Sequence, residues 1–497
     1  MNELLPLDRY GLAFIGVYLV MLLGIGFVGF RSRKENSMRD FYLAGNGIGF
    51  AVLLLTLYST QYSGNTLFGF TGKTYRIGYS WAMCVHFMTA ICCVYVFFAP
   101  QLHRLARTHG FVTPTDYLQH RYQYAPLNFL ATIVMVVAIS NYMLAQLMAM
   151  GRALEGLTVI DDWQAYVMGV IVLAAIIVVY ETLGGFRAVA WTDVVQGSVL
   201  LMGFLVLVWM VLDRYGGLAT ATQTLAEIAP EKVAVPDGNR SREWFSYVLL
   251  VGLGGALYPQ SIQRIYAANS ARVLKNSLIV MAFLPLTTTL VAVIVGIVGA
   301  SQHAGLKNEE ADRILTILCR QIQGESTFGY WLVVVLFAAV LAAIMSTADS
   351  VLLSISSMLS KDIYGRFIKP EASEADLTKV GKRVSWVLIV VLSALAIALR
   401  GQTLVKMLDR KFDLLVQLAP GFLMGIYWRQ LTGRAVYLGL IAGVTASILI
   451  AIASELLLGG SKPMGIHPGL YGLAVNLAVI VAANQGNQGD QSAGNDG

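Results

Sequence analysis

Charged residues are scarce in this chain of 497 residues. Asp, Glu, Lys and Arg together make up 13% of the sequence, whereas hydrophobic residues make up 57%. Soluble domains carry about 25% charged residues, so the composition excludes an ordinary soluble domain. Apolar runs fill nearly the whole length, and we therefore expect an all-α protein that crosses a membrane many times.

Cysteines and catalytic motifs are also few. The four cysteines have neither the spacing of a metal site nor that of a disulfide framework, which indicates small buried apolar residues. The motifs HExxH, GxSxG and Walker A are absent, and no carboxylates are paired for acid–base catalysis, so we expect no enzyme activity. The net charge of +6 mostly records membrane topology, so the sequence indicates a lipid bilayer but neither a nucleic acid nor an obligate protein partner.

Thirteen apolar runs are long enough to span a bilayer, which puts the two termini on opposite sides. The runs lie near 10–30, 48–72, 79–101, 127–151, 163–183, 189–212, 244–267, 276–300, 329–357, 384–399, 412–428, 434–458 and 466–484. The first is too long for a signal peptide and reads as a retained helix. Clusters of Lys and Arg place the N-terminus outside and the C-terminus in the cytoplasm, with the protein in the plasma (inner) membrane. These clusters of Lys and Arg lie at 31–39, 104–107, 264–275 and 361–383.

The second and seventh runs contain residues that interrupt helices. They read LYSTQYSGNTLFGFT at 57–71 and VGLGGALYPQSIQ at 251–263. Gly costs about 1 kcal/mol in a helix interior and Pro about 3 kcal/mol, so such segments unwind where a cavity satisfies the freed carbonyl groups. One such helix is as readily a kink without function. A pair at corresponding positions favours a transporter built from inverted repeats, with its site near the middle of the membrane.

The ninth run contains LAAIMSTADS at 341–350, which has three hydroxyls and a carboxylate where a span normally carries hydrocarbon. Polar groups at that depth are expensive and mark an ion or substrate path. Hard cations prefer oxygen ligands, so we predict that Ser346 and Thr347 bind a coupling cation. The alternative is that these hydroxyls bond to their own helix or join two helices.

Three local patterns resemble the sodium:solute symporter family. They are the segment 180–196 with Gly184, Gly185 and Asp193, the segment 343–350, and the segment 259–270. The resemblance covers almost the whole chain. It implies a leucine-transporter-like core of five plus five inverted helices, with one leading and two trailing helices. The resulting parts are 1–46 (leading helix and cytoplasmic loop), 47–213 (first repeat), 214–243 (extracellular loop), 244–428 (second repeat), 429–484 (two C-terminal helices) and 485–497 (disordered tail).

The resemblance also implies a site for Na+. Its ligands would be the carbonyl groups of Ser59, Tyr62 and Ala343 and the hydroxyls of Ser346 and Thr347.

Asp193, Asp349 and Ser350 are candidates for a second ion or for the ion exit. Asp349 departs from the hydroxyl that relatives with a second sodium carry, and Asp193 is equally well a helix N-terminal residue favoured by the helix dipole. Relatives often carry a small or hydroxyl residue at the position of Glu181, whose role stays open.

The solute is expected at the interrupted helices and two neighbouring positions. The candidates are Gln61, Ser63, Asn65, Thr66, Phe68, Gln146, Gly254, Gly255, Tyr258 and Gln417. Proline carriers of the family have an acidic residue where this chain has Gln61, which disfavours proline. We expect sodium-coupled symport of a small polar organic solute into the cell by alternating access, the solute being a pantothenate-like acid, a sugar or a sugar acid. The alternatives are proton coupling through Asp193 or Glu181, and a transporter-like solute sensor.

Overall fold

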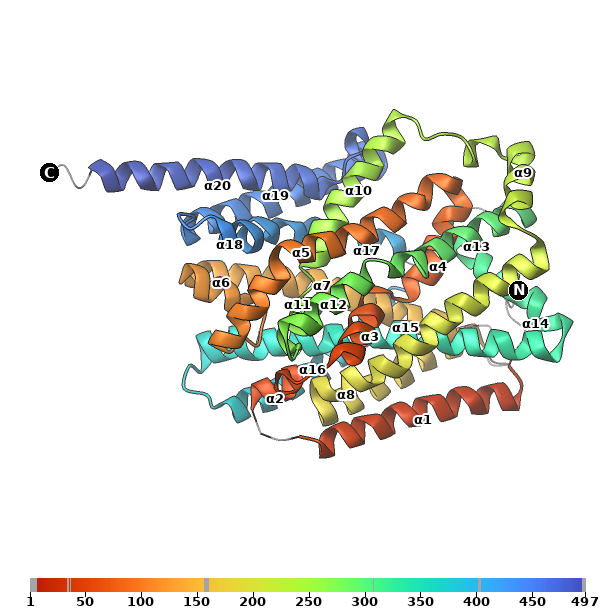
Figure 1. Ribbon diagram of the computed structural model, residues 1–497, viewed down its shortest axis with the longest axis horizontal. Coiled ribbons are helices and arrows are strands. Elements are labelled where there is room, and N and C mark those ends of the chain that lie inside the picture. The colour runs from red at the N-terminus through yellow and green to blue at the C-terminus, as the bar shows by residue number, and fades with distance from the viewer. Residues whose placement is uncertain are drawn as a thin grey trace.

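The computed structural model describes residues 7–33, 35, 37–155, 161–306, 308–400 and 404–493. Over these residues the chain is almost entirely helical, and the long helices lie roughly along the longest axis of the molecule (Figure 1). Among the described residues, eight helices are long and apolar enough to cross a membrane, or nine if one bent pair counts as a span. A multi-pass helical protein is thus confirmed, and the number of thirteen spans stays a prediction.

The helices follow one another with short connections. Their bounds are α1 (Arg9–Arg31), α2 (Met38–Leu43), η1 (Ala44–Asn46), α3 (Phe50–Gln61), α4 (Gly64–Ile77), η2 (Gly78–Ala82), α5 (Met83–His109), α6 (Thr115–Tyr122), α7 (Ala125–Leu154), α8 (Asp162–Tyr215), α9 (Leu218–Ile228), η3 (Pro230–Lys232), α10 (Gly238–Ala256), α11 (Pro259–Ala267), α12 (Ala271–Met281), η4 (Leu284–Leu286), α13 (Thr289–Gln302), η5 (Asn308–Arg313), α14 (Ile314–Glu325), α15 (Thr327–Met358), η6 (Leu359–Ile368), α16 (Glu374–Ala398), α17 (Leu404–Leu415), η7 (Val416–Leu418), η8 (Pro420–Met424), α18 (Gly425–Tyr427), α19 (Gly433–Leu458), η9 (Pro463–Gly465) and α20 (Pro468–Ala493).

Both interruptions expected from the sequence are present. The helix α3 ends at Gln61 and α4 begins at Gly64, with Tyr62 in an extended conformation (φ −104°, ψ 103°). The helices α10 and α11 meet at an angle of 51°, and Pro259 takes the first position of α11, where its missing N–H costs nothing.

The long helix α8 combines two of the predicted spans, 163–183 and 189–212, and turns between them at Gly185. This residue has φ +61° and ψ −153°, a conformation that residues with a side chain rarely adopt. A Cβ atom there would also lie 2.5 Å from the carbonyl oxygen of Phe41. The second glycine of the 184–185 pair is therefore required by backbone geometry and close packing.

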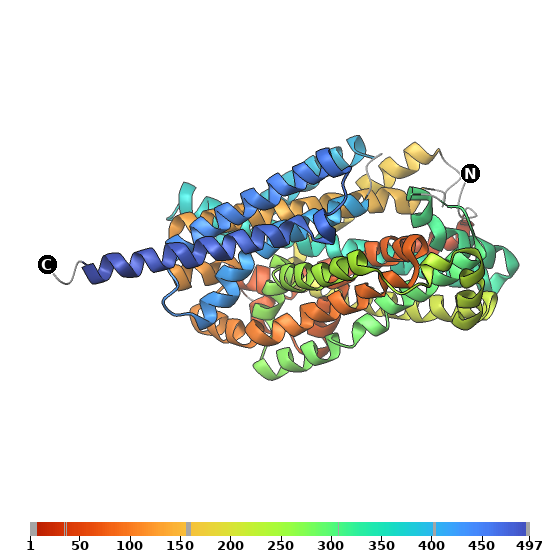
Figure 2. The same cartoon turned by 90° about the horizontal axis from the view of Figure 1, so that it is seen from above.

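The helix α15 lies at the centre of the bundle and packs against α7, α8, α3 and α16. Its residues from Phe337 to Met358 are all buried, which explains why this run is apolar around its whole circumference. The helices α19 and α20 pack against each other, and α20 projects beyond the rest of the molecule (Figures 1 and 2). It covers the span predicted at 466–484 and continues as helix into 485–493, where the sequence favours disorder.

Candidate functional site

The first interruption lies directly against α15. A helix end leaves its last carbonyl oxygens without intrahelical partners, and Ser59 lies in the last turn of α3. Gly64, at the start of α4, packs so closely on the side chain of Ile344 that a Cβ atom would clash there. The interruption and its free carbonyl groups are therefore next to the turn of α15 that begins at Ala343.

Two hydroxyls on this turn are buried and already donate their protons. Ser346 Oγ donates a hydrogen bond to Asp193 Oδ1, and Thr347 Oγ1 donates to the carbonyl oxygen of Ala343 at 3.0 Å. A hydroxyl that donates its proton elsewhere keeps its lone pairs for a cation. The donor set, made of carbonyl and hydroxyl oxygens, suits a hard monovalent cation.

A buried ion pair lies beside these hydroxyls. Arg264 Nη2 is 2.9 Å from Asp193 Oδ2, and the arginine side chain is only 1% exposed. The guanidinium also donates from Nε to Thr56 Oγ1 at 2.8 Å and to the Thr56 carbonyl oxygen at 3.1 Å. The assignment of Arg264 to a cytoplasmic charge cluster is therefore wrong, because a carboxylate and several acceptors satisfy its charge inside the protein.

Asp349 and Ser350 extend the same polar cluster. Arg264 Nη2 donates to Ser350 Oγ at 2.5 Å, and Ser350 Oγ donates to Asp349 Oδ1 at 3.1 Å. The Tyr180 hydroxyl donates to the other carboxylate oxygen of Asp349 at 2.5 Å. Hydrogen bonds thus connect both carboxylates proposed for ion handling through one arginine and one serine.

Four members of this cluster were not predicted as site residues. They are Thr56, Thr60, Tyr180 and Arg264. Thr56 and Thr60 are one turn apart in the first interrupted run, 48–72, and Arg264 follows the polar residues of the second, 244–267. Their position beside the interruptions is the sequence signal that could have identified them. Tyr180 opens the family-like segment at 180–196 but carries no other mark in the sequence.

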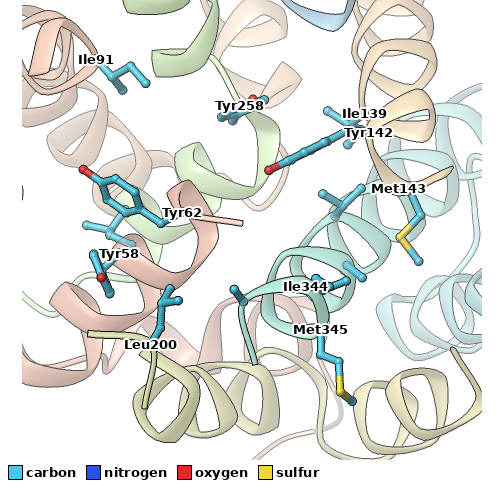
Figure 3. Packing of buried hydrophobic residues seen from close by; sticks show 14 of the residues in the cluster. Tyr58, Tyr62, Ile91, Ile139, Tyr142, Met143, Leu200, Tyr258, Ile344 and Met345 are labelled. Atoms are coloured by element: carbon cyan, nitrogen blue, oxygen red, sulfur yellow. The ribbon is translucent and has the colours of Figure 1, made fainter. Parts of the chain in front are cut away.

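A cavity of about 620 Å³ is lined by residues of both interruptions. Gln61, Ser63 and Thr66 line it from the first interruption and Tyr258 lines it from the second. The rings of Tyr142 and Tyr258 stack at a centroid distance of 5.7 Å, and Figure 3 shows Tyr142 reaching from α7 toward Tyr258. The structure therefore brings four of the expected solute residues together around one space.

The remaining expected solute residues do not belong to the described lining of this cavity. Gly254 and Gly255 pack closely against Phe412. Gln417 lies in η7 and donates to the carbonyl oxygens of Asp413 and Gly469, at 3.0 and 2.8 Å. It therefore joins η7 to α20. Phe68 and Gln146 lie on α4 and α7, with Gln146 fully buried. The side chain of Asn65 lies outside the described residues.

The chain is similar to known proteins over most of its length. The model of the sodium:solute symporter family matches residues 41–443. The sodium/pantothenate symporter of Escherichia coli (strain K12) is 27% identical over 481 residues, 94% of this chain and 95% of that protein. The osmoregulated proline transporter OpuE of Bacillus subtilis (strain 168) is 25% identical over 471 residues, 93% and 92% of the two chains.

A solved structure has the same fold. It is described as the substrate-bound outward-open state of a Na+-coupled sialic acid symporter, and it matches with a TM-score of 0.79 at 20% identity. The match covers 96% of this chain and 97% of that one.

Proposed function

Because the chain belongs to the sodium:solute symporter family, whose members are transporters and not enzymes, we propose that it couples Na+ entry to the uptake of a small polar organic solute by alternating access. The observation that carries this proposal is the contact between the first interruption and α15. At this contact, the end of α3 offers free carbonyl groups, and the neighbouring turn of α15 offers the hydroxyls of Ser346 and Thr347. This is the oxygen environment that a sodium ion requires.

In this proposal the coupling ion binds to the carbonyl oxygens of Ser59, Tyr62 and Ala343 and to the hydroxyl oxygens of Ser346 and Thr347. Breaking α3 at Tyr62 makes two of these carbonyls available, because the helix no longer supplies an amide four residues ahead. Ala343 lies inside α15, so its carbonyl oxygen accepts both the helical N–H and the hydroxyl of Thr347. For this carbonyl to bind the ion, the Thr347 hydroxyl would turn away from it and offer its own lone pair to the ion.

The cluster of Asp193, Asp349 and Ser350 is the proposed place for a second ion or the exit path of the first. Ser346 supports this role because its hydroxyl is hydrogen bonded to Asp193 and is also a ligand in the proposed sodium site. An ion that leaves toward Asp193 would exchange hydroxyl and carbonyl ligands for a carboxylate, which already interacts with Arg264.

The solute is proposed to bind in the cavity between the two interruptions, near Gln61, Ser63, Thr66 and Tyr258. A volume of about 620 Å³ is of the size of small-molecule sites and holds a solute such as a pantothenate-like acid, a sugar or a sugar acid. The lining also includes residues of two connecting segments, namely Asp237, Asn239, Arg240, Glu243, Gly460, Ser461, Lys462 and Gly465. In the proposed topology, with the N-terminus outside and the C-terminus in the cytoplasm of the plasma membrane, these residues face the outside.

The test is uptake into proteoliposomes of radiolabelled pantothenate, glucose and glucuronate at fixed pH. We expect an inward sodium gradient to drive accumulation of at least one of them, and replacement of sodium by potassium to abolish it. Accumulation that persists in potassium and follows an imposed proton gradient would favour the proton-coupled alternative.

A further inference from the structure

The solute cavity contains a buried lysine among aromatic rings. Lys411 lines the cavity from α17 and is 4% exposed. Its ammonium nitrogen lies 3.2 Å from the ring centroid of Tyr142, 4.9 Å from that of Phe412 and 5.2 Å from that of Tyr258. Three rings thus hold the cation in place by cation–π attraction, although α17 itself was not expected to supply a charge to the solute.

The charges around the cavity are unequal. Four of the described lining residues are cationic and two are carboxylates. One carboxylate, Glu243, is paired with Arg240 at 2.7 Å and Lys462 at 3.0 Å. The other, Asp237, accepts a hydrogen bond from the backbone amide of Arg240 and caps α10. Both carboxylates are therefore engaged on α10, and the surplus of positive charge favours an anion in the cavity.

Polar groups that suit the rest of a solute come from the first interruption. Gln61 donates to the Tyr95 hydroxyl at 3.3 Å, while its Oε1 atom is buried and has no hydrogen-bond partner among the described residues. A buried acceptor without a donor is costly, and a hydroxyl or amide of a bound solute would supply that donor.

The same tyrosine connects the lysine with the helix that carries the ion ligands. The ring of Tyr142 contacts Lys411, and its helix α7 packs against α15. Thr347 of the proposed sodium site lies on α15. A charge that binds to Lys411 therefore lies against the helix that packs on the ion site.

From this arrangement, and resting on the proposed symport function, we propose that the transported solute is a carboxylate and that Lys411 binds its charged group. The hydroxyl or amide groups of the same solute face Gln61 and Ser63. A carboxylate next to an ammonium gains a charge-assisted hydrogen bond, and this contact determines the preference for an acid over its neutral analogue.

The experiment is a melting-temperature titration of the purified full chain with matched acid and neutral solutes, in sodium and in potassium. The pairs are pantothenate with panthenol, glucuronate with glucose, and lactate with 1,2-propanediol. In sodium, we expect at least one acid to bind tenfold or more tightly than its neutral partner. Lys411→Met should remove this preference, and Lys411→Arg should keep part of it, because the charge remains.

Two readouts keep the result interpretable. Lys411→Met should still bind ²²Na+, which would show that the variant is folded, and Lys462→Met is the control for a second lysine of the same cavity, whose ammonium group contacts Glu243. The assignment is overturned if no acid binds in sodium, if the neutral partners bind as tightly, or if Lys411→Met keeps the preference. An acid preference that depends on Lys411 but not on sodium would support the assignment and contradict sodium coupling.

Discussion

Arg264 on α11 and Asp193 on α8 form an ion pair of 2.9 Å in the interior of the bundle. The arginine also binds the backbone and side chain of Thr56 on α3. Arg264 therefore connects α11 and α3, which belong to the two interrupted helices, to the carboxylate of Asp193. This contact disfavours the alternative in which Asp193 only caps a helix, since its carboxylate is occupied by Arg264, Ser346 and Thr56.

Asp193→Asn should destabilise the protein and weaken ion binding. Removing one partner of a buried pair leaves an uncompensated charge, at a cost of about 3–5 kcal/mol. We expect a lower melting temperature and at least a tenfold loss of ²²Na+ affinity. The double variant Asp193→Asn with Arg264→Gln should recover part of the melting temperature but not the ion affinity. Wild-type ion binding in the single variant would contradict a role of Asp193 in ion handling.

Ser346→Ala combined with Thr347→Ala removes the two proposed hydroxyl ligands. We expect the sodium concentration for half-maximal ²²Na+ binding to rise at least tenfold, with little change in expression. The matched control is Ser356→Ala, because Ser356 is buried on the same helix and donates to its own backbone at Leu353. An equal effect in the control would mean that the loss comes from packing rather than from ion ligation.

The accumulation that one sodium ion can drive depends on the charge of the solute. A tenfold sodium gradient supplies about 1.4 kcal/mol, and one charge moving through 100 mV supplies about 2.3 kcal/mol. A monoanion carried with one sodium ion is electroneutral, so only about tenfold accumulation remains available to it. If Lys411 binds a monocarboxylate, accumulation well beyond tenfold requires a second cation.

Asp349→Asn tests whether that second cation uses Asp349. We expect uptake of a monocarboxylate by the wild-type protein to carry net positive charge, and uptake by the variant to lose its dependence on membrane potential. Measuring the uptake of ²²Na+ and of labelled solute at imposed membrane potentials gives the number of sodium ions carried per solute and the voltage dependence of uptake. Voltage-dependent uptake by the variant at the wild-type ratio would exclude Asp349 as the second site.

Glu181→Gln separates sodium coupling from proton coupling. Glu181 accepts a hydrogen bond from Ser385 at 3.2 Å and so joins α8 to α16, while its other carboxylate oxygen has no hydrogen-bond partner among the described residues. We expect the sodium dependence and the pH profile of uptake to stay within twofold of wild type. A loss of pH dependence in this variant would point to proton transfer through Glu181.

The sequence predicted the interruptions well because their cause is local. Gly, Ser, Asn and Pro weaken a helix wherever they occur in an apolar run, and the chain unwinds at Tyr62 and Tyr258, inside both predicted segments. The turn at Gly185 is similar, because backbone geometry there allows few residues other than glycine. These features depend on neighbouring residues and not on the packing of distant helices.

The side-chain partners were less predictable. Gln61 and Gln417 are both buried glutamines in apolar runs, yet Gln61 lines the cavity and Gln417 binds the backbone of α20. In a membrane protein both the lipid-facing and the core-facing sides of a helix are apolar, so the pattern does not fix how each helix is rotated. Arg264 shows the same limit, because a charge is assigned to a loop unless a partner is known.

The two interrupted helices are also joined at their far ends. The Ile48 amide donates to the Ala267 carbonyl oxygen at 3.2 Å, and the Asn269 amide donates to the Ile48 carbonyl oxygen at 3.0 Å, just before α3 and just after α11. Arg264 on α11 is also hydrogen bonded to Thr56 in the middle of α3, so these two short helices are connected at two points. We therefore expect α3 and α11 to move together when the cavity changes its access from one side of the membrane to the other. A disulfide between residues 48 and 268 should then leave transport intact, whereas a crosslink from α3 or α11 to α15 should stop it.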